Sequence, residues 1–318
     1  MTDIDHKIAR AEAEWRRYGS ENIGVRESGK AFFAALKRSA GKRLRNVCCY
    51  ALAGRKDVSF RPSYDKDKTN IVVSLTSTKS RIGNIIPTLN TLISQSRKPD
   101  LIVLWLGKEG AYPWRIIEKI KAMGIKIKYR EDLGPHTKYY YAFREYKNDL
   151  VITADDDIIY HEKMIEELCL AYKKHKDCVI ARRVNKMRFS PDRKLLKYTD
   201  WIWEYRDAAA PAYDLLATGV GGVLYPPEVL ALKCWESKDF SDICPKADDI
   251  WLKFCELSNG VKIYAADGSH YKYDVINPKC QKSDLATENV DKGKNDEQIK
   301  ACAEYFGMAD DLCERVLA

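Results

Sequence analysis

Three consecutive carboxylates, Asp155, Asp156 and Asp157, are the residues of this sequence whose types and spacing best suit chemistry. Carboxylates packed this closely repel one another unless a cation or hydrogen-bond donors neutralise them. Oxygen-only ligands suit a hard divalent ion such as Mg²⁺ or Mn²⁺. Such an ion can hold a diphosphate and compensate the charge that develops as a nucleoside diphosphate leaves. The triplet therefore predicts a metal and diphosphate site, with a solvated acidic turn or a helix N-cap as the structural alternative.

A second acidic pair, Asp248 and Asp249, precedes a segment in which Ile250, Trp251 and Phe254 fall on one side of a helix. The spacing of these apolar residues predicts that the pair opens a helix. Acidic residues in a first turn interact favourably with the helix dipole, which is a purely structural explanation for the pair.

Three glycines, Gly219, Gly221 and Gly222, interrupt an apolar stretch that ends near Tyr225. Glycine inside a strand pattern marks a bulge or a close approach of another backbone or a ligand. A plain turn explains two glycines more easily than three, so the run favours a segment that lines a ligand.

Aromatic residues alternate in an irregular segment, as Trp201, Trp203 and Tyr205. Aromatic rings stack on the apolar faces of sugars, so these residues could form a platform for a carbohydrate. They could equally anchor a long loop in the core.

The elements that must position these residues alternate between strand and helix. Apolar β-branched runs predict the strands, and three- and four-residue spacing predicts the helices between them. The predicted strands are 71–75, 101–106, 125–129 and 150–154, and the predicted helices are 82–94, 116–123 and 138–146. This order is typical of an α/β fold with a mostly parallel sheet. The acidic triplet follows the fourth strand, at the sheet edge where ligands of such folds bind.

The order of strand, acidic triplet and helix resembles the DxD site of GT-A glycosyltransferases. Six segments follow the order seen in bacterial capsule and lipopolysaccharide sugar transferases of that superfamily, and the DDD, GG and DDIW order is distantly similar to exostosin-like transferases. The segments are 74–81, 95–106, 134–138, 155–157, 218–227 and 247–252. The resemblance implies a GT-A (Rossmann-like) fold, with a mostly parallel sheet flanked by helices.

The resemblance implies a nucleotide-binding role for several residues. Thr76 and Arg81 would face the uracil or another base. Asp155 or Asp156 would meet the ribose, and Lys138 would lie near the diphosphate. The structural alternative for Arg81 and Lys138 is that both are solvated surface charges.

Metal and sugar contacts are implied in the same way. Asp157, together with Asp155, would ligate Mn²⁺ or Mg²⁺. His270 would add a ligand to the metal or a contact to the diphosphate, although a lone histidine is more often a hydrogen-bonded structural residue. Gly221 and Gly222 would line the donor sugar, where a side chain would collide with it.

The resemblance also implies that Asp249 would accept the proton of the acceptor hydroxyl, with Asp248 as the alternative catalytic residue. The predicted function is metal-dependent transfer of a sugar from a nucleotide-sugar donor, expected to be UDP-linked, to a glycan or lipid-linked acceptor in surface polysaccharide synthesis. Two other classes compete: a non-catalytic glycan- or lipid-binding protein on the same fold, and a Mg²⁺-dependent nucleotidyltransferase that makes the sugar nucleotide. Nucleotidyltransferases of this kind usually carry a glycine-rich loop directly after the first strand, whereas the first glycine after the predicted strand 71–75 is Gly83.

The net charge of +8 is concentrated near the N-terminus. Residues 1–65 carry 14 basic and 8 acidic side chains and show helical spacing of apolar residues, so we expect a basic helical extension before a GT-A domain at 70–318. The asymmetry argues against nucleic acid as a partner and favours a local anionic surface. The extension could contact the inner face of the membrane, dock on the catalytic domain, or assemble a homo-oligomer.

The N-terminus is charged and lacks the apolar core of a secretory signal, so we expect a cytoplasmic protein. The ten cysteines are scattered without a CxxC pair. We expect them to be buried thiols in a reducing compartment rather than disulfides or zinc ligands.

Overall fold

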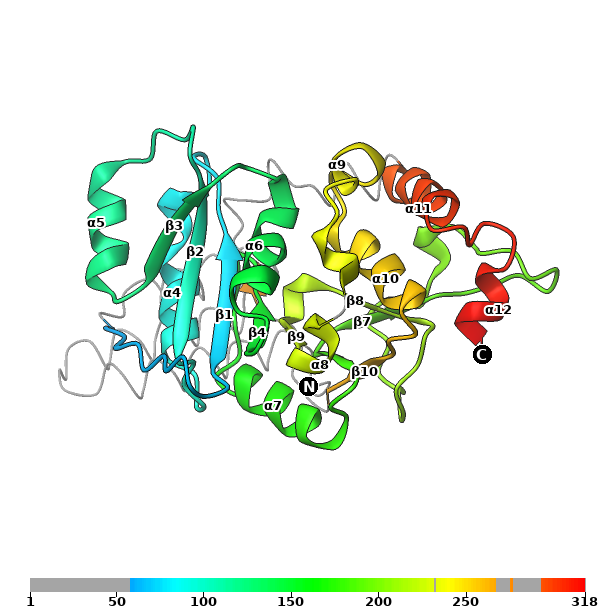
Figure 1. The fold of residues 1–318 in the computed structure, drawn as a ribbon, viewed down its shortest axis with the longest axis horizontal. Coiled ribbons are helices and arrows are strands. Elements are labelled where there is room, and N and C mark those ends of the chain that lie inside the picture. The colour runs from blue at the N-terminus through cyan, green and yellow to red at the C-terminus, as the bar shows by residue number, and fades with distance from the viewer. Residues whose placement is uncertain (1–57, 232, 267–274, 277–292, 318) are drawn as a thin grey trace, which may run out of the picture.

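The computed structural model describes residues 58–231, 233–266, 275–276 and 293–317 (Figure 1). The expected helices of the N-terminal extension and the candidate ligand His270 lie outside these residues.

A seven-stranded sheet with the order β10-β6-β9-β4-β1-β2-β3 forms the centre of the molecule. Its strands are β1 (Ile71–Thr76), β2 (Leu101–Gly107), β3 (Lys126–Arg130), β4 (Leu150–Thr153), β6 (Val179–Ala181), β9 (Val223–Tyr225) and β10 (Ile263–Ala265). β1 to β4 pair in parallel, as the alternation of strands and helices predicts. β9 runs antiparallel to both β4 and β6, while β10 is parallel to β6. The described residues also form two small antiparallel pairs, β7 (Val184–Lys186) with β8 (Leu215–Ala217) and β5 (Ile158–Ile159) with β11 (Val275–Ile276).

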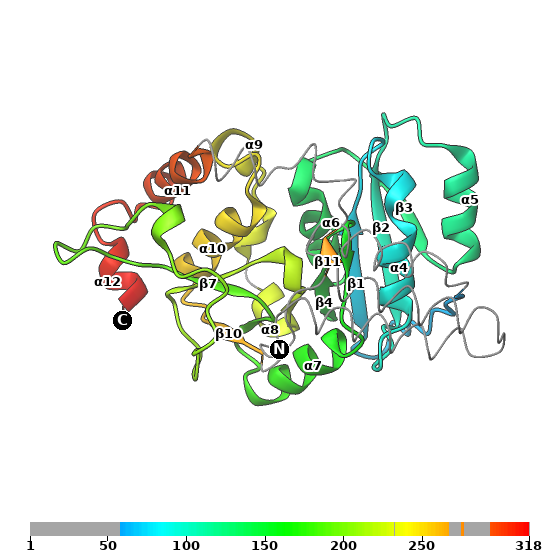
Figure 2. The ribbon, with the colours of Figure 1, turned by 180° about the vertical axis from the view of Figure 1, so that it is seen from behind.

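Helices cover both faces of this sheet. They are α4 (Ile86–Ile93), α5 (Trp114–Ala122), α6 (Thr137–Glu145), α7 (Met164–Lys174), α8 (Pro227–Leu230), α9 (Phe240–Ile243), α10 (Asp248–Ser258), α11 (Lys294–Tyr305) and α12 (Leu312–Leu317). α6 lies in front of the strands in Figure 1, and α4 lies in front of them in the reverse view of Figure 2. The fold is therefore the predicted α/β arrangement of a mostly parallel sheet between helices.

The side chains of β1 point alternately into two apolar cores, which explains why the apolar run of this strand is continuous. Val72 packs into the core that contains α6 and α10, while Val73 and Leu75 pack into the core that contains α4, α5 and α7. Successive side chains of a strand point to opposite faces, so a strand covered on both sides needs apolar residues at every position.

The segment before β1 packs on the same domain. Phe60 is buried in the core beneath α5, and its N–H donates to the Met123 carbonyl at 2.8 Å. Tyr64 donates its hydroxyl to Asp149 at 3.0 Å. Residues 58–65 are thus bound to the sheet domain.

The six cysteines of the described residues are free and buried, which confirms the expectation of buried thiols for these positions: Cys169, Cys178, Cys244, Cys255, Cys302 and Cys313. Within the described part of the chain, no helix combines the length and apolar character needed to cross a bilayer.

Candidate active site

The acidic triplet lies just beyond the end of β4, beside the end of its parallel neighbour β1. Arg81, in the turn after β1, pairs with Asp156 at 2.5 Å and with Asp157 at 2.8 Å. Ser77 donates its hydroxyl to the second oxygen of Asp156, also at 2.5 Å. Asp156 is buried and joins the two strand ends, whereas Asp155 and Asp157 remain partly exposed.

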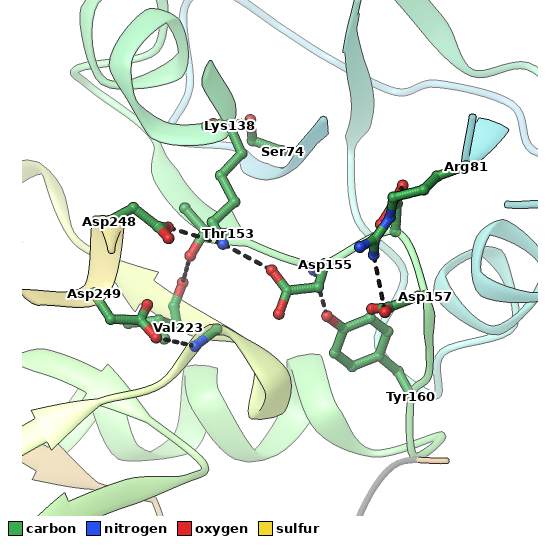
Figure 3. Close-up of polar contacts among 12 residues, drawn as sticks. Ser74, Arg81, Lys138, Thr153, Asp155, Asp157, Tyr160, Val223, Asp248 and Asp249 are labelled. Atoms are coloured by element: carbon green, nitrogen blue, oxygen red, sulfur yellow. Dashed lines mark hydrogen bonds and ion pairs between the residues drawn. The ribbon is translucent and has the colours of Figure 1, made fainter. Parts of the chain in front are cut away.

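Lys138, at the start of α6, connects the triplet to the second acidic pair (Figure 3). Its ammonium lies 2.7 Å from Asp155 Oδ1 and 2.9 Å from Asp248 Oδ2, and its side chain is only 8% exposed. Burial by itself would lower the pKa of Lys138, but attraction to Asp155, Asp248 and Asp249 raises it well above its ordinary value. Lys138 is therefore a charged bridge between the end of β4 and the start of α10, not a solvated surface charge.

The start of α6 is held in place from two sides. Ser74 of β1 donates its hydroxyl to the Lys138 carbonyl at 2.5 Å. His136 is buried, with Nε2 2.8 Å from the Cys244 carbonyl and its ring stacked on Phe240 at 4.1 Å. Burial lowers the pKa of His136 to about 4, so this ring is neutral at physiological pH. Its role is to hold the Lys138 turn against the segment that leads into α10.

Asp248 and Asp249 open α10, as predicted. Asp249 is half-buried and accepts a hydrogen bond from the Gly219 N–H at 3.4 Å. Burial, followed by repulsion from Asp248, raises the pKa of Asp249 to about 8. The pair therefore contains one carboxylate held by Lys138 and one with a high proton affinity.

The predicted close approach at the glycine run exists, in a tight turn over Gly219–Gly221 between β8 and β9. A Cβ on Gly219 would lie 3.0 Å from both Asp155 Oδ1 and Lys138 Nζ. A Cβ on Gly221 would instead meet Arg183 at 2.9 Å. Gly222 has φ +84°, and a Cβ there would meet Met164 Sδ at 2.9 Å. Gly219 is thus the glycine that faces the ion pairs, and the spacing of the three glycines alone did not distinguish it.

Thr76 and Tyr160 differ in their relation to the triplet. Thr76, at the end of β1, donates its hydroxyl to the Trp105 carbonyl at 3.1 Å rather than to a carboxylate of the triplet. Tyr160, which the sequence interpretation missed, accepts the Asp155 N–H at 2.7 Å through its buried hydroxyl. Tyr160 orients the backbone of the triplet, and the only sequence signal for it was its position three residues after Asp157.

The donor set can be tested for a divalent cation. Asp155 and Asp157 carry carboxylate oxygens of the kind that such an ion binds, and their side chains are 25% and 16% exposed. Among the described residues, no group of three or more His, Cys, Asp or Glu side chains is placed to hold a metal. Mg²⁺ is commonly held by one or two carboxylates together with waters and substrate phosphates, so these two carboxylates fit such an ion.

Comparison with solved structures gives many remote likenesses, among them three synthases or synthetases. CMP:2-keto-3-deoxy-manno-octonic acid synthetase complexed with CTP is 14% identical (69% of this chain, 98% of that chain, TM-score 0.40). 4-Diphosphocytidyl-2C-methyl-D-erythritol synthase is 9% identical (68% and 97%, TM-score 0.43). Glucosyl-3-phosphoglycerate synthase from Mycobacterium tuberculosis, in complex with Mn²⁺, UDP and glucosyl-3-phosphoglycerate, is 13% identical (39% and 51%, TM-score 0.30). All three TM-scores are low, so the likenesses do not distinguish one activity from another.

A comparison with curated proteins gives no match. Residues 75–220 match the sequence model of Glycosyl transferase family 2. This segment contains Arg81, Lys138 and the acidic triplet, whereas Asp248 and Asp249 follow it. The chain thus carries a region similar to Glycosyl transferase family 2 on an α/β fold of the GT-A type.

Proposed function

We propose that the protein is a metal-dependent glycosyltransferase that moves a sugar from a UDP-linked donor to a glycan or lipid-linked acceptor in surface polysaccharide synthesis, at the inner face of the membrane. One observation carries the proposal. Buried Lys138 joins Asp155, inside the segment that matches the family, to Asp248 at the start of α10. A candidate donor site and a candidate acid–base pair therefore share one location.

Asp155 and Asp157 are the residues that would hold Mn²⁺ or Mg²⁺. When bound, the ion supplies positive charge to the diphosphate as it leaves. Arg81 and Lys138 already place two cations beside these carboxylates. In our proposal Arg81 and Lys138 orient the diphosphate from two sides, since both are anchored by carboxylates of the triplet.

Asp249 is the better candidate for the general base. Asp248 pairs with the Lys138 ammonium at 2.9 Å, whereas Asp249 accepts a longer, uncharged hydrogen bond from the Gly219 N–H at 3.4 Å. A carboxylate with its pKa raised to about 8 is a stronger base than an ordinary aspartate once it is deprotonated. In our proposal Asp249 accepts the proton of the acceptor hydroxyl as the new glycosidic bond forms.

The proposal is tested by the products released from a panel of nucleotide sugars with the full-length protein, with Mn²⁺ and with excess chelator. A glycosyltransferase releases a nucleoside diphosphate, and we expect this release to require the metal. Pyrophosphate formed from a nucleoside triphosphate and a sugar phosphate would instead identify a nucleotidyltransferase. Donor binding without either product would identify a binding protein.

A further inference from the structure

The loop that follows Tyr198 exposes one of its aromatic side chains and buries another. Ile202 pairs with Lys186 of β7 through two backbone hydrogen bonds of 2.8 and 3.0 Å, which fix the path of the loop. Trp201 is buried, while Trp203 is 39% exposed and packs edge-on against Tyr198 at 5.2 Å between ring centroids. The loop therefore presents Trp203 to solvent on a rigid support.

Glu204 adopts an unusual backbone conformation next to this tryptophan. Its φ of +53° lies in the left-handed region, which costs a residue with a side chain more than it costs glycine. Asn185 accepts the Glu204 N–H at 3.0 Å, and Arg183 pairs with the Glu204 carboxylate at 3.3 Å. Strain of this kind persists only where several contacts enforce it, and it clusters at ligand sites.

Arg183 lies on the other side of the glycine turn from the ion pairs of the active site. Gly221 packs directly on its backbone, and Thr218 donates its N–H to the Arg183 carbonyl at 3.0 Å. Gly219 of the same turn faces Asp155. The Arg183 Nε is buried and has no hydrogen-bond partner among the described residues. Polar atoms in such a position are uncommon and call for an explanation.

Tyr198 and Asn185 link Trp203 to Glu204. Tyr198 is buried, and its pKa is raised to about 12, first by burial and then by the charge of Asp249. Asn185 also donates to the Tyr198 hydroxyl at 3.3 Å. The glycine turn relates this cluster to Asp249, because Thr218 donates its N–H to the Arg183 carbonyl and the next residue, Gly219, donates its N–H to Asp249. Arg183, with Glu204 paired to it, therefore lies beside the turn that contacts Asp249.

From this placement we propose that Trp203, Glu204 and Arg183 bind the sugar unit that presents its hydroxyl to Asp249, and that this unit is uncharged. The inference rests on the glycosyl transfer proposed above. An indole ring stacks on the apolar face of a sugar ring, while a carboxylate accepts from, and a guanidinium donates to, neighbouring hydroxyls. Glu204 neutralises Arg183, and Asp249, in the deprotonated form that acts as the base, repels an anionic sugar.

The first test is acceptor binding by the full-length protein with UDP and Mn²⁺ on an array of neutral, uronic-acid and phosphorylated glycans. We expect binding to neutral glycans and its loss in Trp203→Ala. Trp114→Ala is the matched control, because Trp114 is 70% exposed on α5 and lies outside the site. Binding confined to charged glycans, or equal binding by wild type and Trp203→Ala, overturns the inference. The array does not depend on turnover, so its result is distinguishable from a failure of the proposed function.

The second test uses Glu204→Gly, which removes the carboxylate and relieves the left-handed strain. We expect the KM for the glycan acceptor to rise about tenfold or more, as lost charge-assisted hydrogen bonds imply. The KM for the donor should stay at the wild-type value, and the thermal midpoint should not fall, because glycine tolerates this φ. A fall in thermal midpoint with unchanged acceptor KM would assign Glu204 a structural role and overturn the inference.

Discussion

Asp248 and Asp249 are neighbours in sequence, yet their carboxylates have different surroundings. Asp248 lies 2.9 Å from the Lys138 ammonium, whereas Asp249 is half-buried against the Gly219 N–H. Lys138 is nearly fully covered, so its attraction to Asp248 is weakly screened by water. This difference in surroundings, rather than any difference in residue type, separates the carboxylate that pairs with Lys138 from the one that we propose as the proton acceptor.

Replacing Asp249 with asparagine tests the proton acceptor. The carboxylate acts as a base only when deprotonated, so kcat/KM of the wild type should rise with pH and level off above about 8. Asp249→Asn should lose this rise and lower turnover by about a hundredfold or more. UDP affinity, measured by calorimetry, should stay unchanged. Parallel losses of UDP affinity and turnover would place Asp249 in the donor site instead.

The same substitution has a predicted effect on stability. The folded protein holds the Asp249 proton more tightly than the unfolded chain, because the pKa is raised from 3.8 to about 8. The contribution of Asp249 to wild-type stability therefore falls as the pH rises from 3.8 to about 8, and it stays low above pH 8. Asp249→Asn should raise the thermal midpoint at pH 9 more than at pH 4, and thermal unfolding at the two pH values checks it. Asp192→Asn, on an exposed loop, is the control.

Alanine substitutions of Asp156 and of Asp157 should differ in their effect on the stability of the protein. Asp157 is partly exposed, and Asp157→Ala should abolish turnover and Mn²⁺-dependent UDP binding while the far-ultraviolet circular dichroism stays unchanged. Asp156 is buried beneath Ser77 and Arg81, so Asp156→Ala should also lower the free energy of unfolding by about 1–3 kcal/mol. Full activity of Asp157→Ala would show that the triplet is not the metal site.

At the scale of elements, the turn between β8 and β9 contributes to both the site and the fold. Gly219 leaves room for Asp155 and Lys138, whose flexible ends can move away from a new methyl group. Gly222 combines a left-handed φ with a close contact to Met164 of α7. Two glycines three residues apart are therefore required for different reasons.

Paired alanine variants separate these reasons. Gly219→Ala should displace the Lys138–Asp155 ion pair and reduce turnover at least about tenfold. Its thermal midpoint should change little. Gly222→Ala should lower the free energy of unfolding by about 1–3 kcal/mol, since alanine is strained at this φ. Denaturant titration and initial rates on both variants check the prediction, and a greater loss of stability in Gly219→Ala would contradict it.

At the scale of the whole molecule, the site lies where the parallel strands meet the C-terminal helices. Asp155 follows β4, which is paired with β1, and Asp248 and Asp249 belong to the first turn of α10 (Figure 3). The antiparallel strand β9 lies between β4 and β6 and brings the glycine turn to this junction. Residues 1–57 of the basic N-terminal extension lie outside the described residues, and a membrane contact through them is a proposal that an experiment can test.

Deleting residues 1–57 tests that contact. This boundary keeps Phe60, which belongs to the core of the sheet domain. The deletion should abolish sedimentation with anionic lipid vesicles at low salt, because each cation near an anionic surface contributes about 1 kcal/mol. Turnover on a soluble acceptor should persist, and neutral vesicles are the control. If the full-length protein ignores anionic vesicles at low salt, the extension is a docking or assembly element.

The sequence by itself determined the strands β1, β2 and β4, because continuous apolar runs such as Leu101–Leu106 are required of strands buried on both faces. It also determined that the triplet follows β4 and that Asp248 opens a helix, since both depend on local order along the chain. The tertiary structure alone decided that Lys138 joins Asp155 to Asp248 and that Gly219 faces this pair. Such pairings depend on how remote elements cross, which local periodicity does not encode. Burial then set the proton affinity of Asp249, because the cost of a charge depends on the packed surroundings and not on the residue type.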